Sequence, residues 1–292
     1  MKVDIVVHPH APHQRTAGEA LAAGMARHGD EARIITHSVN ARADIAVCWG
    51  WRTGRRLRDT GRRVLVMERG YVGDRFLWTS LGWDGLNGRA RFPFIDDGGA
   101  RWRECFEHLL QPEREGGEYV LMLGQVKGDA SLEKIGVADH WYAKAAHEIG
   151  QRLDLPVKFR PHPVQVERDG PPRSGQLYGM ELIQGSLDEA LAGAVVAVAW
   201  NSNSLTEAAL AGVRVIACDP GAMVWPIAGQ GMDADPCLRG REAWAHRLAW
   251  CQWARAEIEN GAAWEAVKAA MPTTVPTWSD IEAEDRWLDA FA

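Results

Sequence analysis

Several features that would place a protein in a specialised class are missing from this 292-residue sequence. No apolar run approaches the ~20 residues that a membrane-spanning helix needs. Residues 1–8 have the pattern of a strand and lack the layout of a signal peptide. The five cysteines are odd in number and include no CxxC pair, which argues against a disulfide framework and a zinc cage. We therefore expect a cytoplasmic protein with buried or idle thiols and no membrane span.

A strongly basic balance is also missing. The net charge is −6, and such an acidic chain is a poor non-specific nucleic-acid binder. The charge is uneven, because residues 1–115 carry 18 Lys and Arg against 15 Asp and Glu, whereas the remainder carries 15 against 24. The basic first half leaves room there for a partner that bears phosphate.

Apolar strand patterns alternate with helical patterns along the whole chain. Such βα alternation predicts an α/β protein with parallel, doubly wound sheets. A polar segment with proline and paired glycine, residues 111–117, interrupts the pattern and is the best candidate for a domain linker. We predict strands at 2–8, 32–36, 44–49, 63–68, 118–125, 157–159, 195–200 and 214–218, and helices at 14–28, 55–60, 101–110, 139–153, 187–192, 205–211, 241–259 and 279–291.

Two of the predicted strands end in unusual polar loops. Residues 157–164 run from an apolar strand into Pro161-His162-Pro163, where two prolines fix the backbone on either side of the imidazole. Held at a strand end, His162 could donate to a departing phosphate. The strand at 195–200 is followed by Asn201, Ser202, Asn203 and Ser204, more polar groups than a simple helix cap needs. We expect Ser202 and Ser204 to bind phosphate and Glu207 to bind ribose hydroxyls.

The first half offers candidates for the other substrate. His8, His10 and His13 share a proline-rich loop, which leaves open a substrate-facing loop, a plain surface loop or a metal site, although no carboxylate or cysteine stands at a partner spacing. Arginines are dense in residues 52–63, and either a solvated helix face or a phosphate-contacting patch explains them. From this half we select as acceptor-binding residues His8, His10, Arg52, Arg55, Arg69 and Asp74.

The segment 68–90 is long, rich in glycine and follows a strand, and loops of this length are often functional. Glu68 lies at the carboxyl end of that strand, where α/β sheets place catalytic groups, and Glu68, Asp74 and Asp84 are candidates for a general base. The alternative is that each only pairs with a nearby arginine. Asp96 and Asp97 precede two glycines, a composition typical of a turn. Trp244, Trp250 and Trp253 are expected to be core or domain-packing residues rather than a stacking platform.

Read as a set, certain residues of the second half resemble the nucleotide-binding half of GT-B glycosyltransferases, especially the capsular-polysaccharide Kdo-transferase type. The His-Pro and serine-rich motifs are also similar to those of bacterial sialyltransferases, and residues 68–90 and 249–253 resemble uncharacterised phage-encoded proteins. The resemblance covers roughly residues 118–218. It is carried by Leu123-Gly124-Gln125, Asp129, Ser131, Arg160–Pro163, Asn201–Ser204, Glu207, Ala211-Gly212 and Val215-Ile216.

This resemblance implies two Rossmann-like domains facing a cleft, with the donor nucleotide on the second and the acceptor on the first. We place the domains at 1–113 and 114–275, and expect residues 276–292 to form a helix that returns to the first domain. His162 would contact the nucleotide phosphate or act as an acid on it. Asp96-Asp97-Gly98 matches the acidic motif that holds the sialyltransferase base, but its surroundings differ, so Glu68 stays ahead of Asp96. The donor-binding set is Gln125, Asp129, Ser131, Arg160, His162, Asn201, Ser202, Ser204 and Glu207.

We therefore predict a glycosyltransferase that moves a sugar from a nucleotide-sugar to a hydroxyl, either on a glycan or on a hydroxymethylated base in phage DNA. The nucleotide-sugar is a substrate, and no cofactor or metal is expected. A phage-encoded protein would act in the host cytoplasm. Two alternatives stay open: a nucleotide-sugar epimerase of the same fold, and a non-catalytic protein that binds sugar nucleotides or glycans. The sequence leaves the sugar, the base and the oligomeric state undefined.

Overall fold

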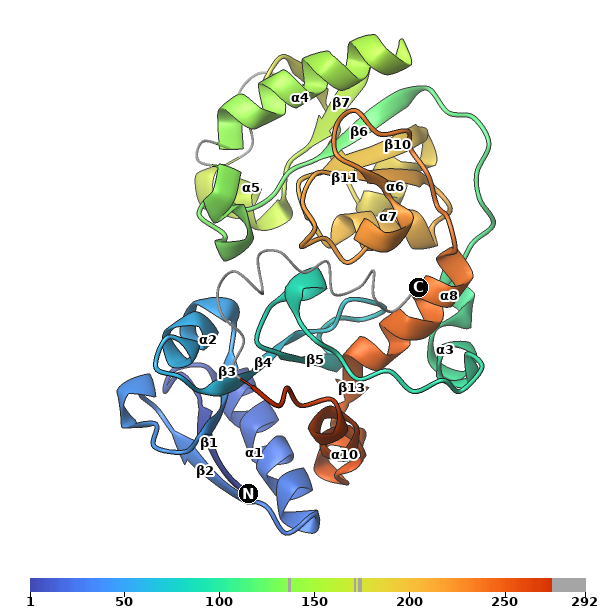
Figure 1. Ribbon diagram of the computed structural model, residues 1–292. Helices are drawn as coiled ribbons and strands as arrows, with labels where there is room; N and C mark the ends of the chain where they lie inside the picture. Colours follow the sequence, from blue (N-terminus) through green and yellow to red (C-terminus); the bar gives the residue numbers. More distant parts are fainter. Residues whose placement is uncertain (136–137, 171, 173–174, 275–292) are drawn as a thin grey trace. The chain divides into compact units, whose positions relative to one another are not determined.

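The computed structural model describes residues 1–135, 138–170, 172 and 175–274 (Figure 1). Its chain divides into two compact units, of which the first comprises Met1–Glu107 and the chain from Ala245 on, and the second comprises His108–Trp244. All five cysteines are free thiols. None of the helices in the described ranges combines the length and the apolar character that crossing a membrane requires.

The first unit contains a six-stranded sheet in the order β13-β5-β4-β3-β1-β2. The four strands from β4 to β2 are parallel, whereas β5 runs antiparallel to β4 and β13 antiparallel to β5. The strands are β1 (Lys2–Val6), β2 (Glu31–Ile35), β3 (Ile45–Trp49), β4 (Arg63–Arg69), β5 (Trp78–Trp83) and β13 (Gln252–Ala254). The helices of this unit are α1 (Pro12–Arg27), α2 (Trp51–Arg58), α3 (Ala100–Cys105), α9 (Arg255–Glu259) and α10 (Ala262–Ala269), with 3-10 turns η1 (Ser38–Asn40), η2 (Asn87–Arg89) and η6 (Ala249–Cys251).

Side-chain alternation along these strands builds a core on each face of the sheet. Ile5, Val47 and Leu65 pack with α1, α9 and α10, and Trp253 and Trp264 join them. The residues between them, such as Ala46 and Val66, face the other way and pack with Leu57 of α2. Successive side chains of a strand point to opposite faces, so strands that are apolar at every position are buried on both sides.

The second unit contains a seven-stranded sheet in the order β12-β11-β10-β6-β7-β9-β8, parallel except for β8. Helix α4 covers the apolar cluster on one face, where Tyr142 and Ile149 meet Met122, Phe159 and Val198. The strands are β6 (Tyr119–Leu123), β7 (Val157–Arg160), β8 (Gln176–Leu177), β9 (Met180–Leu182), β10 (Ala194–Ala199), β11 (Arg214–Ala217) and β12 (Gly229–Gln230). The helices are α4 (Ala138–Leu153), α5 (Pro163–Asp169), α6 (Leu187–Ala192), α7 (Ser204–Leu210) and the first half of α8 (Arg241–Leu248); the short helical turns η3 (Glu107–Leu109), η4 (Ala130–Ile135) and η5 (Trp225–Ile227) complete the chain.

The predicted helix over 241–259 is wrong, because the chain leaves the helix after Leu248 and forms β13 before it enters α9. The predicted long loop at 68–90 contains β5, which pairs with both β4 and β13. Short elements α5, β8, β9 and α10 were not predicted. The tryptophan prediction is confirmed for Trp244 and Trp253, which are fully buried, while Trp250 is half-buried.

The two units divide the chain differently from the predicted domains. The linker at 111–117 has no regular secondary structure, as expected, but its backbone bonds to the second unit through Gln111 and Arg114. Residues 245–274 belong with the first unit, because β13 pairs with β5 and α9 and α10 pack against α1. The helix predicted at 279–291 lies outside the described residues.

Candidate functional site

Polar side chains gather at the carboxyl edge of the second sheet. Four neighbouring parallel strands, β7, β6, β10 and β11, end there in the same direction. The residues that follow them are His162, Gln125, Asn201 and Asp219. The chain passes from β6 to β7 on one side and later places β10 on the other side of β6. Such a reversal of strand order opens the crevice in which α/β sheets bind ligands.

Gln125 and Asn201 face each other across this reversal. The Nε2 of Gln125 donates to the Oδ1 of Asn201 at 2.8 Å, and the backbone N–H of Asn201 donates to the Oε1 of Gln125 at 3.1 Å. Asn201 is only 3% exposed. A buried amide must satisfy both its donors and its acceptor, so this reciprocal pair fixes the two strand-end loops against each other.

Asp219 completes this pair and was not predicted. Its Oδ2 accepts from the Nδ2 of Asn201 at 2.7 Å and from the backbone N–H of Gly221 at 3.2 Å, and the side chain is buried. The sequence contained the necessary signal, because Asp219 directly follows an apolar strand, as Gln125 and Asn201 do. The expectation for that strand ended at Cys218, its last apolar residue, and did not consider the next position.

Two of the predicted donor residues order the loop that follows β6. Asp129 accepts the backbone N–H of Ser131 at 2.9 Å, which closes a tight turn. The Oγ of Ser131 accepts from Gln125 at 3.3 Å and its carbonyl accepts from Asn201 at 3.0 Å. The same loop bonds to Gln165 of α5 through the backbone of Lys127. Gln125, Asp129, Ser131 and Asn201 thus belong to one connected network.

His162 is the N-cap of helix α5 rather than part of an irregular loop. Its Nδ1 accepts the backbone N–H of Val164 at 3.2 Å, and Pro163 occupies the first helical position. A proline there suits the fixed backbone angle of a first helical turn. Because Nδ1 is the acceptor, the neutral imidazole carries its proton on Nε2.

Arg160 and Glu207 lie close enough for their charges to interact. Burial lowers the pKa of the Arg160 guanidinium, and the Glu207 carboxylate opposes this by favouring the charged form. Arg160 also donates to the carbonyl of Gly185 at 3.3 Å. Glu207 is exposed in the first turn of α7. Arg160 and Glu207 therefore place one cation and one anion at the carboxyl edge of the second sheet.

Residues 201–204, which precede the predicted helix at 205–211, do not act together as its cap. Helix α7 begins at Ser204, and its N-cap, Asn203, makes no side-chain capping bond. Asn201 is instead committed to Gln125 and Asp219. The buried Ser202 accepts the backbone N–H of Ser204 at 3.3 Å. This turn brings the two serines together next to the Gln125–Asn201 pair.

Glu68 and Arg69 end strand β4 in the first unit, as predicted for Glu68. The Oε1 of Glu68 accepts the backbone N–H of Arg69 at 3.0 Å. The Arg69 guanidinium lies over the ring of Phe76 at 4.4 Å and near that of Trp49 at 5.8 Å. Burial lowers the pKa of His13, and the charge of Arg69 lowers it further. Glu68 is half-buried at an edge that also holds Arg69 and Trp49.

Asp96 and Asp97 form the turn that the composition indicated. Asp96 accepts the backbone N–H of Gly98 at 3.3 Å, and Asp97 accepts those of Gly99 and Arg101, both at 2.8 Å. Burial would raise the pKa of Asp97, but these backbone bonds lower it overall. Both carboxylates therefore organise the start of α3.

The other candidates of the first unit are dispersed. Asp74 closes a turn by accepting the backbone N–H of Phe76 at 3.0 Å. Arg52 and Arg55 are exposed on α2. His10 is exposed, and its backbone N–H donates to the Nδ1 of His8 at 3.2 Å. His8 itself lines a cavity of about 290 Å³. Among the described residues, no group of three or more His, Cys, Asp or Glu is arranged to hold a metal ion.

Comparison of whole structures identifies the architecture. The Thermosulfurimonas dismutans KpsC β-Kdo 2,7-transferase is 15% identical, aligns over 92% of this chain and 99% of its own, and gives a TM-score of 0.57. The β-Kdo 2,4-transferase of the same KpsC is also 15% identical, covers 85% and 89%, and gives 0.54. This chain has the GT-B glycosyltransferase fold. No protein-family model and no curated protein matches the sequence.

The GT-B assignment confirms the predicted fold class of two Rossmann-like units with mainly parallel sheets. The likeness to phage-encoded proteins stays a prediction. Within this GT-B chain, the second unit holds a connected strand-end network, Gln125–Asn201–Asp219 with Ser131. The first unit holds Glu68 and Arg69 at its own strand edge. These two sets are the candidate functional residues of the two units.

Proposed function

We propose that this protein is a glycosyltransferase that moves a sugar from a nucleotide-sugar donor to a hydroxyl acceptor. The observation that carries the proposal is the Gln125–Asn201–Asp219 network, with Asn201 and Asp219 buried, at the strand-order reversal of the second unit. Buried polar groups cost stability unless they are satisfied, and here they are satisfied by one another. Because the network lies where α/β sheets bind ligands, it supports a role in shaping a ligand site. The GT-B fold is used for this class of reaction.

The donor would bind on the second unit. Ser202, Ser204 and the Nε2–H of His162 offer donors for phosphate oxygens, and Arg160 offers positive charge. Glu207 would accept from the ribose hydroxyls. Gln125, Asn201, Asp129 and Ser131 position the two loops, and we assign them to shaping the donor site. The proposal includes no cofactor and no metal.

The reaction itself needs a base and a stabilised leaving group. The Glu68 carboxylate would take the proton of the acceptor hydroxyl, whose oxygen forms a bond to the anomeric carbon. The bond from that carbon to the phosphate oxygen breaks, and its electron pair stays on the phosphate. His162 and Arg160 would stabilise this developing charge. We place Glu68 ahead of Asp96 because Glu68 lies at the carboxyl end of the parallel strand β4, where α/β sheets place catalytic groups, whereas Asp96 lies in the turn before α3.

A glycan fits the acceptor better than DNA. Arg58 is buried against Trp51 and bonds the carbonyl of Asp84, and Arg62 bonds the carbonyls of Ala41 and Ala43. The arginine cluster at 52–63 is thus partly used inside the fold, which weakens the case for a phosphate-backbone patch. DNA affinity that falls steeply with salt would overturn this choice of acceptor.

Donor binding tests the proposal through His162. We expect one of the UDP-, GDP-, CMP- or dTDP-sugars to raise the melting temperature, because a ligand that binds only the native state stabilises it. His162→Asn keeps an N-cap side chain on α5 but loses Nε2, so it should fold normally and bind that donor at least tenfold more weakly. Ser186→Ala is the matched control. It removes the cap of α6 in the same unit and should cost ~1 kcal/mol of stability without changing donor affinity.

Turnover separates the remaining alternatives. Glu68→Gln should lower kcat by ~10²–10⁴-fold while donor affinity is retained, and Asp96→Asn should change kcat little. Conversion of the donor alone into an isomer would select an epimerase instead. The wild-type protein and Glu68→Gln could both bind the donor without consuming it in the presence of any glycan acceptor. That result would refute the transferase and select the non-catalytic binding protein.

A further inference from the structure

We propose that the first unit carries a binding pocket for a single neutral sugar ring at the carboxyl ends of β1, β2 and β3. We assign this sugar as the acceptor. That assignment rests on the proposed function, whereas the binding itself does not. The pocket is the cavity of about 290 Å³ that His8 lines. Small-molecule sites span ~300–1,000 Å³, so this volume fits one ring rather than a dinucleotide.

The pocket lies at the strand-order reversal of the first sheet. From β1 the chain passes to β2 on one side and then to β3 on the other, which opens a crevice at the ends of these strands. Val6 and His8 come from the end of β1, Thr36 and His37 from the end of β2, and Trp49 from the end of β3. Gln14 of α1, Thr53 of α2, and Val7, Ser38 and Val39 complete the lining.

The lining selects against charged ligands. None of these ten residues has a carboxylate, ammonium or guanidinium group, and its two titratable side chains are the imidazoles of His8 and His37. A phosphate or carboxylate ligand taken out of water needs a paired charge. The lining therefore favours a neutral occupant.

The lining also offers many hydrogen bonds. The hydroxyls of Thr36, Ser38 and Thr53 make no side-chain hydrogen bond to any other residue within the described ranges. Gln14 uses its Oε1 to accept the backbone N–H of His8 at 2.8 Å, which leaves its Nε2 as a donor. Hydroxyls that both donate and accept match the hydroxyls of a sugar, and the flat Trp49 ring suits its apolar C–H face.

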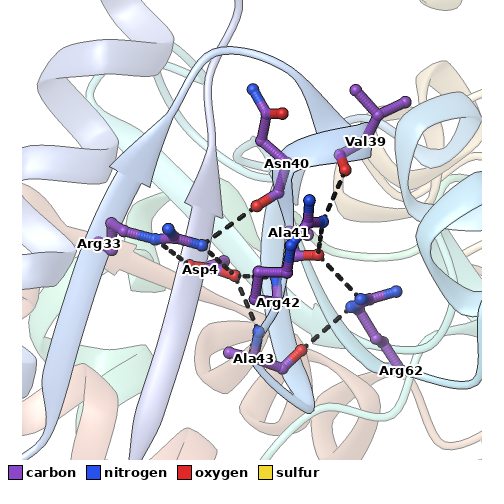
Figure 2. A network of polar contacts seen from close by, with 8 residues as sticks. All are labelled: Asp4, Arg33, Val39, Asn40, Ala41, Arg42, Ala43 and Arg62. Atoms are coloured by element: carbon purple, nitrogen blue, oxygen red, sulfur yellow. Dashed lines mark hydrogen bonds and ion pairs between the residues drawn. The ribbon is translucent and has the colours of Figure 1, made fainter.

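The segment that forms one wall of this pocket is held by a polar network around the buried Asp4 carboxylate, which Figure 2 shows. The Asp4 carboxylate of β1 bonds Arg33 of β2 at 2.8 and 3.0 Å and accepts the backbone N–H groups of Arg42 and Ala43. Arg33 in turn donates to the carbonyl of Asn40 at 3.1 Å. These bonds fix the segment 38–43, whose first residues, Ser38 and Val39, line the pocket. Asp4 is thus a positioning residue for the site.

Ligand-observed NMR tests the pocket in the full-length protein. The probes are the methyl glycosides of glucose, galactose, mannose and N-acetylglucosamine, with methyl glucuronide and 5-hydroxymethyl-deoxycytidine for comparison. We expect saturation transfer to at least one neutral glycoside and none to the glucuronide. Ser38→Ala/Thr53→Val should weaken that binding at least fivefold, and Thr53→Trp should abolish it by filling the cavity. Thr16→Val on α1, outside the lining, should leave it unchanged.

Thermal melts confirm that each variant folds; should Thr53→Trp fail to fold, the double variant alone decides. The proposal is overturned if no neutral glycoside binds, if binding is unaffected by the pocket substitutions, or if only the nucleoside binds. These outcomes are separable from failure of the transferase. A wild-type protein that binds no nucleotide-sugar would refute the proposed function. Glycoside binding in this pocket would be unaffected by that result.

Discussion

At the scale of single residues, Asp4 shows how a buried carboxylate is kept ionised. Burial would raise its pKa, but the hydrogen bonds from Arg33 and from the backbone of Ala43 and Arg42, with the charge of Arg33, lower it from 3.8 to about 2. Because the folded pKa lies below the unfolded value, the stabilisation is fully present above pH 3.8 and is lost as the pH falls through about 2.

Asp4→Asn should therefore lower the free energy of unfolding by ~2 kcal/mol at pH 7. The gap between wild type and variant should shrink as the pH falls from 4 towards 2. Urea unfolding across this range measures both. Asp233→Asn, at an exposed position, is the control and should change stability by less than ~0.5 kcal/mol. A gap that stays constant with pH would show that the carboxylate is not what Asp4 contributes.

Sequence could identify candidate site residues one by one but could not pair them. Gln125, His162 and Asn201 stand out because each follows an apolar strand. That Asn201 bonds Gln125 and Asp219 depends on β10 lying between β6 and β11, which is a property of strand order. The sugar-pocket residues Thr36, Ser38 and Thr53 have no distinctive pattern of their own. Their common feature is position around one crevice.

At the scale of elements, the apolar strands were predictable and the short edge elements were not. The strands β3, β6 and β10 are continuous apolar runs, buried on both faces. In contrast, β13 lies within a sequence of good helix formers, and pairing with β5 overrides that local preference. The side chain of Gln252 anchors β13 to the backbone that follows β4. It accepts the backbone N–H groups of Tyr71 and Val72 and donates to the carbonyl of Val72.

Gln252→Ala should cost about 2–3 kcal/mol, because it leaves two buried backbone donors and one acceptor without partners. Hydrogen exchange should then show faster opening at the Tyr71 and Val72 amides. Gln230→Ala, which removes one exposed bond to the carbonyl of Trp225, is the matched control and should cost under ~1 kcal/mol. Unchanged protection of the two amides would contradict the anchoring role of Gln252.

At the scale of the whole molecule, the first unit is built from two separated parts of the chain, whereas the second is continuous. The apolar cluster on the α1 face of the first sheet includes Trp253, Ile258, Trp264 and Val267, all fully buried. A sequence pattern that restarts after a linker suggests two consecutive domains. The resemblance implied a return to the first domain only for residues 276–292. The pattern contains no sign that residues 245–274 return to the first sheet, since that return depends on edge pairing and on cover for α1.

A chain that ends at residue 244 should therefore lack a folded first unit, because it loses β13, α9 and α10 together with these four core side chains. A fragment of residues 108–248 should fold, since its core is its own. Near-ultraviolet circular dichroism and thermal melting of both, beside the full-length protein, measure this. Cooperative melting of the first unit in the 1–244 chain would show that residues 245–274 are dispensable.

The split first unit also determines the order in which the two units can fold during translation. Domains fold as units once their residues have emerged. The second unit is complete at Trp244, whereas the first, although it begins at Met1, waits for residues up to Val267. During that wait the face of Ile5, Val47 and Leu65 lacks the cover of α9 and α10. Strands β1 to β4 are thus made before the second unit but closed after it, and their uncovered apolar face is where a nascent chain would need a chaperone.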